Sequence, residues 1–376
     1  MNLPISADPR ARGATSNPPN RFQADHIVLD GPLFDDDGEL IEPRTTFLRD
    51  DTQSIIAWND SPDIPFSAGC SPYRGCEHGC AYCFARPYHE YLGYSAGLDF
   101  ETKILVKPRA AELLRKEFSK KSWKPQAVAM SGATDVYQPI ERRLGLTRQC
   151  LEVFAEFRNP VGIITKNHLI TRDIDLLAEL AKYQAVSVCI SLTTLDTELV
   201  KTLEPRASRP SRRLDAIAQL SAAGIPVRVL TAPIIPGLND HEIPALLKAA
   251  AEAGARGAGY TIVRLPHAVA PIFEEWLEKH APGHKEKVLG RIREMRGGKL
   301  YESQWGARMR GDGPLAAQIR HLFQVAKRRA GFAGEDLAIQ NITASHITSG
   351  DRTRLNDELS AAHFRVPTAQ MDLFES

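Results

Sequence analysis

Three cysteines in one short stretch have the clearest chemical use in this sequence. Cys76, Cys80 and Cys83 are separated by three and then two residues. Thiolates are soft ligands, which select zinc, copper(I) or iron–sulfur clusters over hard cations. Because the three lie so close in sequence, they must converge on one compact object, and Gly79 lets the backbone bend tightly between them. Three protein ligands on a four-iron cluster would leave one iron open, which suits a site built for chemistry.

Two other kinds of metal site use cysteines, and each predicts a different protein. Cys70 lies shortly before Cys76 and could complete a structural zinc site, but such sites usually draw their ligands as two separated pairs. An electron-transfer ferredoxin needs a fourth cysteine, and neither Cys150 nor Cys189 has a typical spacing for it. We expect Cys70 to be a small buried residue, as free cysteines commonly are.

The pattern Cys76-x-x-x-Cys80-x-x-Cys83, with an aromatic residue at Tyr82, resembles the signature of the radical S-adenosylmethionine (SAM) superfamily. The resemblance implies a [4Fe-4S] cluster on these cysteines, SAM on its open iron, and a reductant such as a flavodoxin or ferredoxin. One electron would cleave SAM to methionine and a 5′-deoxyadenosyl radical, which abstracts hydrogen from a substrate. The wider stretch 71–93 is similar to the branch labelled "DNA repair photolyase", related to spore photoproduct lyase.

The rest of the chain alternates short β-branched runs with amphipathic stretches. One strand is predicted just before the cysteines, and the others cover Ala127–Ser131, Val161–Thr165, Val186–Ser191, Val227–Ala232 and Gly259–Val263. The predicted helices between them cover Thr147–Phe157, with Thr147 as N-cap and Cys150 in the core, then Asp173–Lys182, Ser211–Ala223 and His241–Ala253. Alternating strands and helices predict an α/β protein with parallel βαβ units. Six units resemble the partial (β/α)6 TIM-like barrel of radical SAM enzymes, whose chemistry lies at the C-terminal ends of the strands.

Four segments are predicted along the chain. Residues 1–22 are rich in Pro, Arg, Asn and Ala without apolar periodicity, which is typical of a disordered tail. Residues 23–64 carry short apolar pieces and are interpreted as an irregular N-terminal cap. The radical SAM core is expected over 65–280. Residues 281–376 are predicted to form a C-terminal helical extension and tail, with helices over Gly283–Arg293 and Gly313–Arg329.

The resemblance also implies contacts to SAM at the ends of the predicted strands. Ser131 and Gly132 match a short Gly-rich motif that binds the SAM amino group. Lys166 matches a lysine that pairs with the SAM carboxylate, although a lysine at a sheet edge is the alternative. Ser191 matches a ribose-binding serine. Arg206, in a Glu-Pro-Arg triplet that looks characteristic of the branch, is expected to bind SAM or substrate, or to cap a neighbouring helix.

The hydrogen donor is a point of departure from the branch. Spore photoproduct lyases carry a hydrogen-donating cysteine directly before the serine of strand two, and here Met130 stands there. A thioether cannot donate hydrogen in the same way, so photoproduct repair itself is in doubt. Strand alternation puts Cys189 on the same face as Ser191. Cys189 or Tyr137 is therefore a candidate hydrogen relay, and a small thiol filling the barrel lumen is the alternative for Cys189.

Composition predicts where the protein acts. A hydrophobic share of 43% and a charged share of 25% are ordinary for a soluble globular protein. The N-terminus shows no signal-peptide pattern, and no apolar run approaches the ~20 residues that a membrane span needs. Six cysteines are too few for a disulfide scaffold in a chain of 376 residues. We expect a cytoplasmic protein with no membrane partner.

The substrate is predicted from weaker signals. A formal net charge of +1 means that any basic surface must be local, and the helix over Gly313–Arg329 carries such a cluster. Near the C-terminus, Gln370, Leu373 and Phe374 belong to a pentapeptide similar to those by which bacterial repair proteins dock on the sliding clamp. Nucleic acid is the first expectation for the substrate. The alternatives are a small molecule or a protein, or a non-catalytic iron–sulfur or zinc nucleic-acid-binding module.

Overall fold

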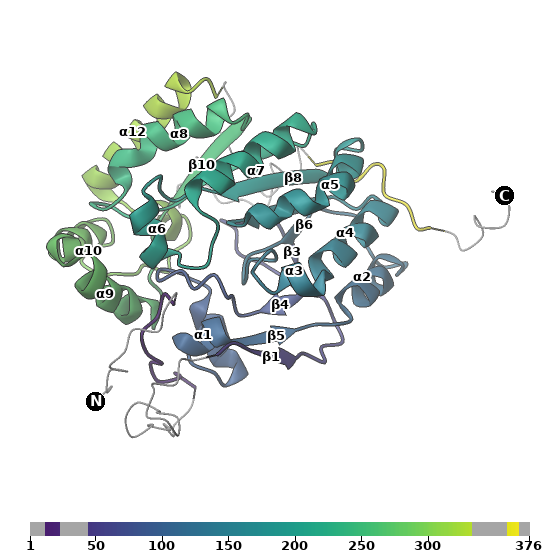
Figure 1. The fold of residues 1–376 in the computed structure, drawn as a ribbon, viewed down its shortest axis with the longest axis horizontal. Coiled ribbons are helices and arrows are strands. Elements are labelled where there is room, and N and C mark those ends of the chain that lie inside the picture. The colour runs from purple at the N-terminus through teal and green to yellow at the C-terminus, as the bar shows by residue number, and fades with distance from the viewer. Residues whose placement is uncertain (1–11, 23–43, 333–358, 368–376) are drawn as a thin grey trace.

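A parallel β-sheet organises the part of the chain that the computed structural model describes, which is residues 12–22, 44–332 and 359–367 (Figure 1). Among these residues the largest sheet has seven strands in the order β10-β9-β8-β7-β6-β3-β2. All neighbours are parallel except β2, which pairs antiparallel with β3. The strands are β2 (Ile56–Trp58), β3 (Ala68–Cys70), β6 (Val128–Met130), β7 (Val161–Thr165), β8 (Val186–Ser191), β9 (Val227–Ile234) and β10 (Gly257–Ile262). The six parallel strands confirm the predicted partial (β/α)6 barrel.

Helices cover the outer side of this sheet. Neighbouring helices contact one another in the orders α2–α4–α5 and α7–α8–α12 (Figure 1). They are α2 (Ala110–Phe118), α3 (Glu141–Leu144), α4 (Leu146–Phe157), α5 (Ile174–Ala181), α6 (Thr197–Leu203), α7 (Pro210–Ala222), α8 (Ile243–Glu252), α9 (Val269–His280), α10 (Lys285–Glu294), α11 (Ala307–Arg310) and α12 (Gly313–Arg329). Four short 3-10 helices join them: η1 (Arg86–Leu92), η2 (His168–Asp173), η3 (Asp240–Glu242) and η4 (Pro282–His284). The predicted helices are therefore present.

The predicted N-cap of α4 is wrong. Gly145 occupies the cap position with φ 64°, and the hydroxyl of Thr147 donates instead to the carbonyl oxygen of Val136 at 2.6 Å. Cys150 on the same helix is fully buried in the main core, as its spacing predicted. The apolar periodicity was correct, but Thr147 lies two residues after the cap position and inside the helix, where its hydroxyl does not cap the free N–H groups.

The two faces of each strand have different surroundings. On β8, Val188 and Ile190 are almost fully buried beneath the outer helices, whereas Ser187 and Cys189 are only half-buried. The second face lines the barrel lumen, because successive side chains of a strand point to opposite sides. Ile164 of β7 is on this face and keeps 36% of its surface exposed. The lumen therefore offers accessible surface at the centre of the sheet.

A small second sheet supports the region before the barrel. Its three described strands, in the order β1-β5-β4, are β1 (Thr46–Arg49), β5 (Lys103–Val106) and β4 (Tyr73–Arg74). The short helix α1 (Leu98–Thr102) leads directly into β5. Since β4 ends at the residue before Gly75, this sheet holds the chain where it enters the cysteine-bearing stretch.

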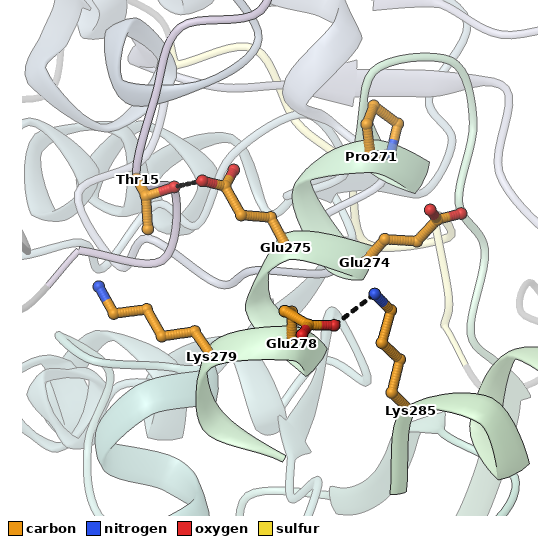
Figure 2. Close-up of a pocket in the computed structure, with 7 residues that line it drawn as sticks. All are labelled: Thr15, Pro271, Glu274, Glu275, Glu278, Lys279 and Lys285. Carbon is orange, nitrogen blue, oxygen red and sulfur yellow. Dashed lines mark hydrogen bonds and ion pairs between the residues drawn. The ribbon is translucent and has the colours of Figure 1, made fainter. Parts of the chain in front are cut away.

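Residues 12–22 are not a disordered tail but pack against the core, and we call them the N-terminal strap. The N–H groups of Gly13 and Ala14 donate to the buried carboxylate of Glu101 at 3.1 and 2.8 Å. Thr15 donates to Glu275 of α9 beside a surface pocket (Figure 2). For residues 12–22 the prediction was wrong, because the strap is held by backbone hydrogen bonds to a distant carboxylate, which leave no apolar pattern in the sequence.

No helix in the described ranges is both long and apolar enough to cross a membrane.

The predicted boundary of the radical SAM core at residue 280 stays a prediction, as does the assignment of residues 23–64 as a cap.

Candidate active site at the strand ends

The three cysteines lie on one tightly anchored loop, residues 75–84, which we call the cysteine loop. Gly75 and Gly79 bend it with φ values of 80° and 66°, which other residues rarely adopt. A methyl group on Gly79 would lie 2.4 Å from a carboxylate oxygen of Glu101, so the approach also requires glycine. The buried guanidinium of Arg86 donates to the carbonyl oxygen of Cys80 at 2.9 and 3.1 Å. The loop is therefore held in this conformation by contacts within the chain.

The thiols of this loop lie close together in a dry environment. Cys76 and Cys80 are each 7% exposed, and Cys83 is half-buried. Burial raises the pKa of Cys83, and the negative charge of Cys76 raises it further. Burial and the negative charge of the neighbouring Glu204 likewise raise the pKa of Cys80, and the charges of Cys83 and Cys76 raise it further. Thiolates that repel one another in this way are stabilised by a shared positive centre.

This donor set fits an iron–sulfur cluster. Within the described ranges no three His, Cys, Asp or Glu side chains surround a single ion position. A four-iron cluster does not require such a position, because each thiolate binds a different iron. Three thiols on one loop, mutually close and shielded from water, match that requirement.

Lys166 lies at the centre of the site. It follows β7, a middle strand, so the sheet-edge alternative is wrong. Its Nζ donates to Oγ of Ser191 at 2.9 Å and lies 5.8 Å from the ring centre of Tyr82. Ser191, at the end of β8, in turn donates to the carbonyl oxygen of Ala232 at 3.1 Å. The structure thus brings Tyr82, Lys166 and Ser191 together at the strand ends.

Glu204 joins the cysteine loop to the strand ends, a role that was not predicted from the sequence. It is fully buried and accepts hydrogen bonds from the hydroxyls of Tyr82 and Thr193 and from the guanidinium of Arg213. Burial alone would raise the pKa of this carboxyl, but the charges of Arg213 and Lys166 overcome it and lower the pKa to about 2. Its position in the Glu-Pro-Arg triplet was the available signal.

Asp135 forms a second tie to the loop. Its carboxylate accepts from the backbone N–H of Lys166 at 2.8 Å and lies 3.3 Å from Nδ1 of the buried His78. Burial lowers the pKa of His78, but the charges of Asp135 and Cys76 reverse this and raise it to about 10. The pair of the His78 imidazolium with the Asp135 carboxylate fixes the loop against the end of β7.

The Gly-rich stretch after β6 lies beside Lys166. The hydroxyl of Ser131 donates to the carbonyl oxygen of Ile164 at 2.7 Å. Gly132 has φ 108°, and the space that a Cβ would occupy is open. Both residues are therefore at the C-terminal end of the barrel with backbone groups accessible to a ligand.

Two sequence-predicted site residues have other partners. Arg206 pairs with Glu77 at 3.1 Å and lies 3.4 Å from the hydroxyl of Thr45, so its guanidinium braces the cysteine loop. Tyr137 is fully buried and donates to Asp173 at 3.1 Å, at the start of α5. Its hydroxyl is held in the outer layer rather than in the lumen, which removes it as a hydrogen relay.

Cys189 and Met130 differ in the face that they occupy. Met130 is fully buried in the main core and does not face the lumen. Cys189 pairs in register with Ile164 and Arg228 and shares the lumen face with Ser191. Burial raises the pKa of Cys189 to about 12, although the charges of Arg228 and Lys166 act in the opposite direction. The side chain therefore stays a protonated thiol at neutral pH.

A partial parallel barrel with three thiols on one loop and a lysine at the strand ends defines the class of radical SAM enzymes. Residues 70–250 match the family model described as the radical SAM superfamily. An uncharacterized protein of Mycobacterium tuberculosis is 38% identical over 234 residues, which is 62% of this chain and 68% of that protein. The chain belongs to the radical SAM superfamily and is a radical SAM enzyme.

Two further relatives have more specific names. A radical SAM Nα-GlyT isomerase of Pseudomonas phage M6 is 27% identical over 256 residues, covering 67% of this chain and 50% of the isomerase. The structure of spore photoproduct lyase complexed with dinucleoside spore photoproduct superposes with a TM-score of 0.56, at 13% identity over 76% of this chain and 79% of the lyase. This structural likeness confirms the fold.

Proposed function

We propose that Cys76, Cys80 and Cys83 hold a [4Fe-4S] cluster and that Lys166 binds the carboxylate of SAM beside it. The observation that carries this proposal is the junction at Tyr82. This residue of the cysteine loop lies beneath the ammonium of Lys166 and donates to Glu204, so the thiols and the lysine share one rigid frame. The bound cofactors supply reductive cleavage of SAM and a radical that abstracts hydrogen.

The remaining residues orient SAM. Ser131 and Gly132 present polar groups to the SAM amino group at the end of β6. Ser191 would bind the ribose, and its hydrogen bond from Lys166 supports a position beside the SAM carboxylate. The desolvated thiols and the anchored loop exclude water from a reaction that cannot tolerate stray hydrogen donors.

We further propose that the substrate is a nucleic acid, with a small molecule or a protein as the alternative. The support comes from relatives: one is named as an Nα-GlyT isomerase, and a protein of the same fold was solved with a dinucleoside photoproduct. A flavodoxin or ferredoxin would supply the electron. The clamp-binding residues Gln370, Leu373 and Phe374 lie outside the described residues, and docking on a sliding clamp remains part of this proposal.

Anaerobic reconstitution tests the cofactor assignment. The dithionite-reduced protein should give an EPR signal of a reduced four-iron cluster that changes when SAM is added, together with 5′-deoxyadenosine. Cys83→Ala should abolish the SAM-dependent signal, whereas Cys150→Ala, which changes a fully buried core thiol, should retain it. Stoichiometric zinc, or a cluster indifferent to SAM, would show a binding module instead of an enzyme.

Substrate class is tested with the same preparation. Modified or damaged oligonucleotides should increase 5′-deoxyadenosine formation and transfer deuterium between substrate and deoxyadenosine. Stimulation by a peptide or metabolite extract, with none by nucleic acid, would overturn the nucleic-acid assignment.

A further inference from the structure

Two arginines with unsatisfied donors lie at the C-terminal end of β10. Arg296 is 4% exposed, and its Nη2 donates to the carbonyl oxygens of Val263 and Arg308 at 2.7 and 3.2 Å. Its Nε and Nη1 are buried and, in the part of the chain that the structure describes, have no hydrogen-bond partner. Arg264 is half-buried, with Nη1 3.6 Å from the sulfur of Met309 and an Nε that is likewise buried without a partner among those residues.

The two charges act on each other, and neither arginine lies within ion-pair distance of a described carboxylate, although Glu302 and Asp312 act on Arg296 from further away. Burial lowers the pKa of Arg296 to about 10, and the charge of Arg264 is the next contribution in the same direction. No ion pair between described residues includes either arginine, whereas the neighbouring Arg308 is paired with Asp63. Buried charges are costly unless they are paired, and two like charges together more so. An anion between them would complete the arrangement.

The pair belongs to the same rim of the barrel as the cysteine loop. The guanidinium carbon of Arg264 lies 4.9 Å from the ring centre of Phe84, the residue after Cys83. Phe84 keeps 39% of its surface exposed, so part of the ring is accessible to a ligand beside the charge. Arg264 is the less buried of the two and lies nearer the protein surface, whereas Arg296 lies deeper.

We propose that Arg264 and Arg296 bind a phosphate group of the substrate and that Phe84 contacts the neighbouring base. This inference rests on the proposed function, because it assigns part of the nucleic-acid substrate to named residues. Guanidinium donors match the oxygens of a phosphate in fork geometry. An aromatic face beside a cation is the arrangement by which proteins hold single-stranded nucleic acid.

Binding of single-stranded DNA to the reconstituted holoenzyme tests the site. We would measure the fluorescence anisotropy of a labelled thymidine hexanucleotide at several salt concentrations, with inorganic phosphate as competitor. Arg264→Gln should weaken binding about tenfold and reduce the slope of log affinity against log salt by about one. Arg264 donates to no backbone carbonyl in the described structure, so this variant should fold even if Arg296→Gln does not. The control is Arg109→Gln, which removes a fully exposed arginine paired with Glu112.

The outcomes separate this inference from the proposed function. Unchanged affinity and salt slope in Arg264→Gln, or equal losses in Arg109→Gln, would overturn the phosphate site. Displacement of the oligonucleotide by succinate but not by phosphate would show a carboxylate site and overturn it as well. Formation of 5′-deoxyadenosine by the wild-type protein without substrate reports on the proposed function alone. Its absence would refute radical chemistry whatever the anisotropy shows.

Discussion

Replacing Glu204 by Gln should both destabilise the protein and weaken its hold on the cluster. The side chain is fully buried and accepts from Tyr82, Thr193 and Arg213, which is itself fully buried. Glutamine keeps the size of the side chain but removes the charge opposite the Arg213 guanidinium. Because Tyr82 belongs to the cysteine loop, weakening its hydrogen bond to Glu204 also disturbs the loop that carries the thiols.

The magnitude follows from the buried ion pair. Leaving one partner of such a pair uncompensated costs about 3–5 kcal/mol. With an unfolding entropy of about 2.1 cal/mol/K per residue, this lowers the melting temperature of the 376-residue chain by roughly 4–6 °C. Differential scanning calorimetry of the wild type and the variant measures the shift in melting temperature. Iron per chain after reconstitution measures how much of the cluster the variant retains. Glu198→Gln, which changes an exposed pair with Lys201, is the matched control and should leave both unchanged.

The pH dependence of the same comparison gives a second check. The pKa of Glu204 is lowered from 4.5 to about 2 in the folded protein, against its burial, by Arg213 and Lys166. Its stabilising contribution is therefore complete above pH 4.5 and is lost as the pH falls from there towards 2. The difference in melting temperature between wild type and Glu204→Gln should stay constant from about pH 8 to 5 and narrow only below that. Equal melting temperatures of the two proteins, or a difference that already shrinks between about pH 8 and pH 5, would contradict the stabilising role of the Glu204 charge.

Three further variants test other parts of the site. Lys166→Met should weaken SAM binding about 10–100-fold by removing a charge-assisted hydrogen bond, while the iron content stays constant. Equilibrium dialysis measures the SAM affinity, with the surface variant Lys182→Met as control. Unchanged affinity would exclude the role assigned to Lys166. Gly13→Val should loosen the N-terminal strap, because a Cβ there would lie 1.6 Å from a carbonyl oxygen of the cysteine loop. Iron loss in air should then be faster than for the control Gly283→Val, whose added side chain meets open space. Equal rates of iron loss would show that the strap does not protect the cluster. Cys189→Ala should reduce the product formed per 5′-deoxyadenosine if the thiol relays hydrogen, and normal turnover would end that hypothesis.

The barrel was predictable because its signals are local. Runs such as Val161–Thr165 and Val186–Ser191 are short, β-branched and separated by amphipathic helices, and the structure has them as β7 and β8 with the same bounds. The cysteine spacing was equally local, and Lys166 and Ser191 could be placed because each directly follows or ends a strand. What the sequence pattern predicts is the position of a residue along the chain and the face of the element that it occupies.

The supports of the site were not predictable because they join distant segments. Glu204 accepts from Tyr82 across 122 positions of the chain, and Gly13 reaches Glu101 across 88. Neither contact produces a periodicity, and a buried carboxylate in the sequence looks like any solvated one. The partner of Arg206 was not predictable for the same reason, since only the folded loop shows that its guanidinium pairs with Glu77.

The charge at the active-site rim shows why the net charge of the chain was a poor guide to its ligands. The formal charge is only +1, and the described parallel strands contain a single charged residue, Arg228, on the lumen face. The acids at the rim already have cationic partners: Asp135 has His78, and Glu204 has Arg213. Among the described residues, Lys166 and Arg264 have no carboxylate at ion-pair distance. The rim is therefore locally cationic within a nearly neutral protein, so binding of anionic ligands should weaken as salt rises.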